Sequence, residues 1–105
     1  MTSMTQGPKV TDNADQARFE VTIDGSLAEL TYRRRADRLI LIHTEVPDEA
    51  GGHGIGGQLV QAAVDKAGKE GLTLIPLCPF ARSWLERHSE IASRVAIDWS
   101  QPAGR

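Results

Sequence analysis

The first half of the chain alternates between apolar and polar positions and predicts three β-strands. Apolar side chains recur at every second position over residues 19–23 and 28–33, as in strands with one buried face. Residues 39–46 form a nearly unbroken apolar run that predicts a third strand. Turn-forming residues at 24–26 and a charged segment at 34–38 connect them. Because both connections are short, the three strands are expected to form an antiparallel meander.

Beyond residue 54 the apolar residues follow a helical period. They recur at every fourth position from Ile55 to Ala67, while polar residues occupy the opposite side. Gly71 is placed to end this helix in the left-handed conformation that glycine adopts without strain. The short apolar segment 72–77 predicts a fourth strand. A right-handed crossover through the helix makes this strand parallel to the third.

A second helix is predicted from Pro79 and completes the fold. Phe80 and Trp84 lie at helical spacing and are expected in the core. The helix is expected to fray near His88, and residues 89–93 to form one further turn. The order of elements predicts an α/β domain with a mixed sheet. In it, an antiparallel three-strand meander is followed by a helix, a fourth strand parallel to the third and a C-terminal helix.

Composition divides the chain into a central domain and two polar ends. Residues 1–15 contain only isolated apolar positions and cannot bury enough surface to offset the entropy of ordering, so a disordered leader is expected. The same reasoning predicts a flexible tail at 100–105. Residues 16–99 are then the folded domain.

The overall composition is that of a small globular protein and argues against several classes of partner. The chain has 105 residues, 40% of them hydrophobic, and a net charge of −2, so neither nucleic acid nor an acidic membrane is indicated. No apolar run approaches the ~20 residues of a membrane span, and the N-terminus lacks a secretory signal. The lone Cys78 has no disulfide partner, which fits a cytoplasmic location. One cysteine and three scattered histidines give no metal-binding pattern.

A glycine-rich segment between the third strand and the first helix is the strongest functional signal. Five of the seven residues from 51 to 57 are glycine. Glycine lets a backbone approach a ligand closely, and the helix start that follows presents unpaired N–H groups at the positive end of a dipole. Such an arrangement attracts phosphate oxygens. The segment therefore predicts a phosphate-binding turn.

Three kinds of phosphate site place a glycine-rich turn before a helix. Residues 52–57 satisfy the G-x-G-x-x-G dinucleotide fingerprint, but the next strand ends at Leu77, Cys78 and Pro79 without the acidic residue that holds a ribose. A Walker A loop is excluded, since no lysine follows the glycines before Lys66. The third interpretation is a site for the pyrophosphate of coenzyme A.

In support of the third interpretation, the segment resembles motif A of the Gcn5-related N-acetyltransferase (GNAT) superfamily, which runs Arg/Gln-x-x-Gly-x-Gly/Ala. Gly54 and Gly56 occupy its two small positions, and Gly51 stands where the family has Arg or Gln. Together with segments 43–47 and 76–80, the motif is similar to the small stand-alone acetyltransferase-like domains called YjdJ-type. The resemblance covers nearly all of the expected folded domain.

This resemblance implies a minimal GNAT-like fold that uses acetyl-CoA as cosubstrate, without a metal, to acetylate an amine. The residues that it implies for coenzyme binding are Val46, Gly51, Gly52, His53, Gly54, Ile55, Gly56 and Gly57. The amide of Val46 is expected to face the acetyl carbonyl, and His53 either touches a phosphate or faces solvent. A tight turn at 24–26 stands where typical members have helices that shape the acceptor site. An open groove is therefore expected, and with it an acceptor that is an exposed amine of a protein or peptide.

Three residues near the expected thioester position are candidates for the chemistry: Glu45, His43 and Cys78. Glu45, on the same face as His43, is a candidate general base or alternatively a rim residue paired with an arginine. His43 either acts as a base, directly or through water, or is a core histidine bonded to the backbone. Cys78 can accept the acetyl group, protonate the departing coenzyme A, or simply fill the core.

The alternative function is a module that binds acyl-CoA and interacts with partners, with little or no transferase activity. Gly51 in place of Arg or Gln and the missing acceptor elements favour it. A dinucleotide-binding module is a third hypothesis, and it predicts binding of NAD. Turnover with amines separates the first two hypotheses once coenzyme binding has been demonstrated.

Overall fold

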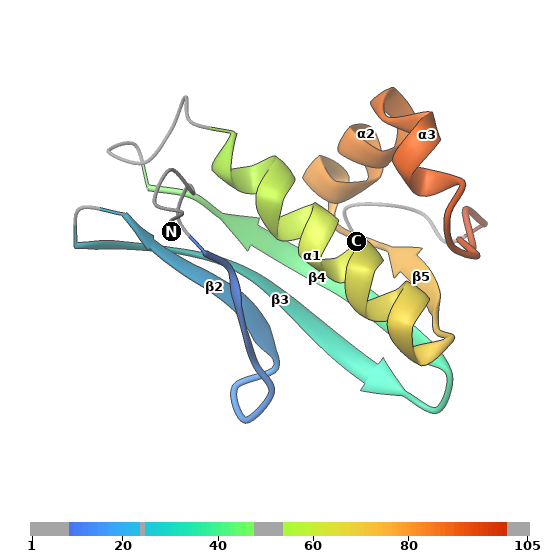
Figure 1. Ribbon diagram of the computed structural model, residues 1–105, viewed down its shortest axis with the longest axis horizontal. Helices are drawn as coiled ribbons and strands as arrows, with labels where there is room; N and C mark the ends of the chain where they lie inside the picture. The colour runs from blue at the N-terminus through green and yellow to red at the C-terminus, as the bar shows by residue number, and fades with distance from the viewer. Residues whose placement is uncertain (1–8, 24, 48–53, 101–105) are drawn as a thin grey trace, which may run out of the picture.

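The computed structural model describes residues 9–23, 25–47 and 54–100, so parts of the expected leader and tail lie outside the described residues. Within these residues, five strands form one sheet in the order β1-β2-β3-β4-β5, and α1 and α2 pack together over one of its faces (Figure 1). The elements are β1 (Thr11–Asn13), β2 (Arg18–Ile23), β3 (Ser26–Arg35), β4 (Arg38–Glu45), α1 (Ile55–Glu70), β5 (Thr73–Pro76), α2 (Pro79–Arg87) and α3 (Ser89–Ala92). Neighbouring strands are antiparallel except β4 and β5, which are parallel. The predicted α/β class, the meander and the parallel crossover are confirmed.

The helix boundaries follow the local signals in the sequence. α1 ends at Glu70, and Gly71 follows with a φ of 68°, as predicted for a left-handed residue after the helix. Pro79 begins α2, where its missing N–H costs no helical hydrogen bond. The predicted further turn is α3. No helix in the described part of the chain is long and apolar enough to cross a membrane.

The N-terminal segment departs from the prediction. The sequence predicts a disordered leader over residues 1–15, and for residues 11–13 this is wrong, because they form β1 against β2. Asp12 accepts hydrogen bonds from the Tyr32 hydroxyl at 2.5 Å and from Lys66 Nζ at 2.7 Å. Backbone pairing and these two contacts order a segment whose polar composition gives no sign of it.

The residues after α3 cover the outer edge of β5. The Leu74 amide donates to Ala96 O and the Asp98 amide donates to Leu74 O, both at 2.9 Å. Ile97 forms a parallel bridge with Leu74. Ser100 is the one residue of the predicted tail that the structure describes, and its amide donates to Asp98 Oδ1 at 3.0 Å. Residues 101–105 lie outside the described residues.

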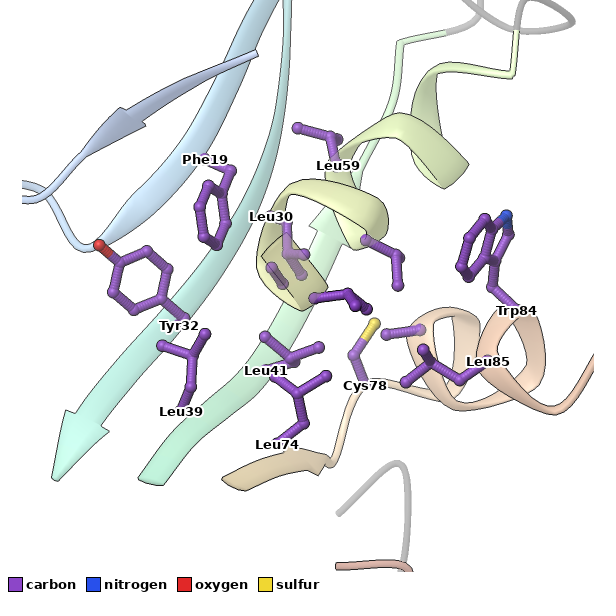
Figure 2. Packing of buried hydrophobic residues seen from close by; sticks show 14 of the residues in the cluster. Phe19, Leu30, Tyr32, Leu39, Leu41, Leu59, Leu74, Cys78, Trp84 and Leu85 are labelled. Atoms are coloured by element: carbon purple, nitrogen blue, oxygen red, sulfur yellow. The ribbon is translucent and has the colours of Figure 1, made fainter. Parts of the chain in front are cut away.

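The core lies between α1 and the sheet, and α2 closes one end of it (Figure 2). Large, fully buried side chains come from both layers, including Phe19, Leu30, Leu39, Leu41 and Leu74 from the strands and Leu59, Val60 and Leu85 from the helices. Burying one such side chain contributes roughly 1.5–3 kcal/mol. The core therefore fixes α1 over the sheet and sets where its N-terminus lies relative to the end of β4.

A β-bulge in β4 decides which of its side chains face the helices. Between Thr31 and Tyr32 of β3 the pairing with β4 slips by one, so that Ile42 is an extra residue on β4. Strict alternation would place His43 on the same face as the buried leucines before it. The bulge reverses the alternation, so Thr44 faces the helix layer and His43 faces the opposite side.

The other face of β2, β3 and β4 carries no helix in the part of the chain that the structure describes (Figure 1). Three carboxylates on adjacent strands, Glu20, Glu29 and Glu45, form a row across it. Arg18 forms ion pairs with Glu20 and, at 3.1 Å, with Glu29. Hydrogen bonds from Arg18 and from Asn13 lower the pKa of Glu20. This face therefore carries charged side chains, of which Glu20 and Glu29 are only partly exposed.

Candidate functional site

A groove of about 570 Å³ opens where the end of β4 meets the N-termini of α1 and α2. It is lined by Thr44, Val46, residues 54–58, Gln61, Phe80 and Trp84. The predicted coenzyme-binding residues that the structure describes, Val46 and 54–57, thus line one groove. The other three, Gly51, Gly52 and His53, lie outside the described residues.

The first turn of α1 has the geometry of an anion site. Gly54 precedes the helix with a φ of 69°, and no side chain among the described residues caps it. The Gln58 amide makes the first helical hydrogen bond, to Gly54 O at 3.0 Å, so the amides of residues 55–57 have no partner within the helix. A Cβ on Gly54 would meet no described atom within 4 Å, so the backbone is accessible there. The helix dipole adds a partial positive charge at the same point.

The next two glycines have a packing role that the sequence did not reveal. A Cβ at Gly56 would lie 2.6 Å from Phe80 Cζ, and a Cβ at Gly57 would overlap the indole nitrogen of Trp84. Both aromatic rings therefore lie directly against the backbone of α1. Trp84 is buried as predicted, but the expectation of a core position for Phe80 is wrong, because its residue is 40% exposed and lines the groove. The backbone at Gly56 gives the Phe80 ring a packing surface outside the core.

Strands β4 and β5 separate beside this groove. Their pairing ends at Leu41 and Pro76. The amides of Leu77 and Cys78 both donate to Leu41 O, each at 3.0 Å, and the chain then turns into α2. Residues 42–45 keep β3 as a neighbour on one side, while no described strand pairs with their other edge. Backbone groups along this edge are therefore available to a ligand in the groove.

Cys78 occupies its predicted place between the fourth strand and the second helix, but it lies behind the groove wall. The residue is 3% exposed and belongs to the hydrophobic core (Figure 2). Its Sγ lies 3.1 Å from Thr44 Oγ1, and either group can donate the hydrogen bond. Thr44 itself lines the groove. Sequence reasoning missed Thr44, because strict alternation assigns it to the outer face and only the bulge brings it inward.

His43 and Glu45 lie together, as predicted, but on the outer face. His43 Nε2 is 3.3 Å from Glu45 Oε1, and the two side chains are 63% and 65% exposed. The alternative of a core histidine is therefore wrong for His43. The Glu45 side chain is exposed rather than enclosed in a cleft, and it contacts His43 rather than an arginine. The bulge thus separates this pair from the Thr44–Cys78 pair by the thickness of one strand.

Comparison with known proteins identifies the family. The sequence model of the GCN5-related N-acetyl-transferases matches residues 18–95, most of the chain. The chain belongs to this family. A solved structure in the same family, a GCN5-like protein of Staphylococcus aureus named as a candidate N-acetyltransferase, shares 29% sequence identity with it. The two structures superpose with a TM-score of 0.66, over 89% of this chain and 93% of the other.

Family membership confirms the resemblance and supports an acetyltransferase function in general terms. The matched residues run from the start of β2 to the residues after α3, and so include the groove, the bulge and both residue pairs. β1 and the residues that cover the edge of β5 lie outside the match. No group of three His, Cys, Asp or Glu placed to hold a metal occurs among the described residues.

Proposed function

We propose that this protein is an acetyl-CoA-dependent N-acetyltransferase that acetylates an exposed amine of a protein or peptide. The observation that carries the proposal is the groove at the start of α1, which adjoins the part of β4 whose edge toward β5 no described strand pairs with. Family membership supports the reaction class. Acetyl-CoA supplies the acetyl group as a reactive thioester, and the chain's task is to bind and orient it.

The groove residues fit the parts of this cosubstrate. The amides of residues 55–57, which have no partner within the helix, suit the pyrophosphate, because they combine N–H donors with the positive end of the helix dipole. The unpaired edge of β4 and the Val46 amide suit the amide-containing pantetheine arm and the acetyl carbonyl. Phe80 and Trp84 supply an apolar wall. Among the described residues, the fit therefore uses backbone groups and two aromatic rings rather than charged side chains.

The acceptor amine is assigned to the outer face of β4. His43 and Glu45 lie there as a pair that can take the proton from the amine, directly or through water. The face has no covering helix among the described residues, which suits an amine carried by a large molecule. Glu45, the carboxylate of the row that Arg18 does not pair with, favours an amine that arrives with a positive charge.

One observation favours the second candidate, a module that binds acyl-CoA without transferring the acyl group. The side chains of His43 and Glu45 are on the outer face, are mostly exposed, and are not among the residues that line the groove. In this case the groove would still bind acyl-CoA. The two functions therefore differ in turnover and agree in binding.

Two measurements in sequence test the proposal. Calorimetric titration with acetyl-CoA, with NAD as control, measures binding first. Release of free thiol from acetyl-CoA is then followed with peptides that present a single lysine or a free N-terminus. Binding with peptide-dependent thiol release and an acetylated peptide supports the transferase, and binding without release with any peptide favours the second candidate. Absence of binding contradicts both.

A further inference from the structure

We infer that Thr44 is a further catalytic residue of the proposed transfer. Its hydroxyl passes a proton from the buried Cys78 thiol to the sulfur of the departing coenzyme A. The inference rests on the proposed function. It assigns Thr44 the contact with the reacting atoms, because Thr44 lines the groove. Cys78 then acts through Thr44.

The placement of Thr44 follows from the bulge at Ile42. Thr44 lies opposite the fully buried Leu30 in the sheet, so its side chain is on the helix side of β4. It lies within the part of β4 whose edge toward β5 is unpaired among the described residues. The hydroxyl therefore stands at the separation of the two strands, between the groove and Cys78.

The chemistry of a hydroxyl suits a relay. Threonine Oγ1 carries one donor and two acceptor lone pairs, so it can accept from Cys78 Sγ–H while donating into the groove. The separation of 3.1 Å between Oγ1 and Sγ is short for a contact that involves sulfur. Cys78 is held in place through its own amide, which donates to Leu41 O at 3.0 Å. Both members of the pair are therefore anchored to β4.

The proton movements balance over one turnover. The acceptor nitrogen forms a bond to the acetyl carbon, and the carbon–sulfur bond breaks with its electron pair on sulfur. That sulfur takes the hydroxyl proton of Thr44, and Thr44 Oγ1 takes the thiol proton of Cys78. The proton lost by the amine leaves through His43 and Glu45 to water. Water then returns a proton to the Cys78 thiolate through Thr44 after the products leave.

This relay accounts for a thiol that the groove does not expose. A residue that is 3% exposed is poorly placed to accept an acetyl group itself, since the acyl carbon must reach its sulfur. Proton transfer through one hydroxyl needs no such access.

Removal of the hydroxyl alone is the first test. Thr44→Val keeps the β-branched shape, and we expect it to lower kcat for thiol release about tenfold to a hundredfold, with KM for acetyl-CoA within about threefold. Thr44→Ser should restore most of kcat. Thr73→Val, at the far end of β5 beside Arg38, is the matched control and should leave both constants unchanged. If Thr44→Val retains the wild-type kcat while wild type binds and turns over acetyl-CoA, the relay is wrong and the proposed function stands.

A second measurement does not depend on turnover. In the ligand-free protein, the ¹³Cβ chemical shift of Cys78 reports the surroundings of its thiol, and it should change in Thr44→Val but not in Thr73→Val. The kinetics of Cys78→Ser and of the double variant, Thr44→Val with Cys78→Ser, complete a double-mutant cycle. If the residues act as one unit, Thr44→Val with Cys78→Ser should lose no more than the worse single variant. An unchanged chemical shift or multiplicative losses would overturn the relay.

Discussion

The indole of Trp84 lies directly against the backbone of Gly57, so that no side chain can be placed at residue 57 without displacing the ring. Trp84 has little room to move, because its residue is only 9% exposed and its ring stacks on His88 with centroids 3.9 Å apart. His88 Nδ1 lies 2.8 Å from Trp84 O, which holds the imidazole over the ring. The start of α1 is thus fixed by aromatic packing as well as by the helix itself.

This contact predicts that Gly57→Ala destabilises the protein. Overpacking at a rigid site costs about 1–3 kcal/mol. At the upper end of this range, the cost outweighs the gain of about 1 kcal/mol that alanine brings through its higher helix propensity. Gly68→Ala in the same helix is the matched control, since its Cβ would make an ordinary contact, 3.5 Å from Val95 Cγ1. Urea unfolding should show Gly68→Ala to be more stable than wild type and Gly57→Ala less stable. Equal stabilisation of both variants would contradict the packing argument.

Gly56→Ala is expected to act on binding rather than on stability. The Phe80 ring that its Cβ would meet is at the groove and 40% exposed, so the ring can move aside. The moved ring and the new methyl group then occupy groove volume. We expect acetyl-CoA to bind about tenfold more weakly, a change of about 1.4 kcal/mol, with the unfolding free energy nearly unchanged. A calorimetric affinity equal to that of wild type would show that Phe80 does not form part of the binding wall.

The fold could largely be predicted from the sequence, whereas the two faces of the site could not. Apolar periodicity locates β2 to β5 and α1 because each has one face toward the core. The bulge at Ile42 leaves no such trace, because residues 39–42, which lead into it, are apolar on both faces. The sequence therefore correctly predicts that His43 and Glu45 share one face of the strand. It does not predict that this is the outer face, and it does not indicate Thr44 as a site residue. β1 was missed for a different reason, since backbone pairing and the contacts of Asp12 order it.

The position of Glu45 on the outer face predicts a separation of binding from turnover. Glu45→Gln should lower peptide-dependent turnover about tenfold to a hundredfold, through loss of the base, and leave the affinity for acetyl-CoA within about twofold. Glu20→Gln lies on the same face, two strands away and paired with Arg18, and serves as the control. If both variants lower turnover equally, the face contributes only its charge, and Glu45 has no specific part in proton removal.

Tyr32 predicts the behaviour of the protein in alkali. Its burial, together with the hydrogen bond to Asp12, raises its pKa, so the folded protein keeps the phenol proton where the unfolded chain, with a pKa of about 10, loses it. Its contribution to stability is therefore complete below about pH 10 and is lost as the pH rises further. Tyr32→Phe should cost about 1 kcal/mol at pH 7 and lose less stability than wild type between about pH 9 and 11. Parallel unfolding curves over that range would contradict this assignment.

The central claim, that the groove at the start of α1 binds acetyl-CoA, is tested most directly by backbone amide NMR of the isotope-labelled protein. The predicted result is a set of saturable shifts on titration with acetyl-CoA, centred on residues 54–58 and Val46 and extending to Phe80 and the Trp84 indole. NAD at the same concentrations should leave these signals in place. Saturable shifts with NAD alone, or none with acetyl-CoA at millimolar concentration, would contradict the account.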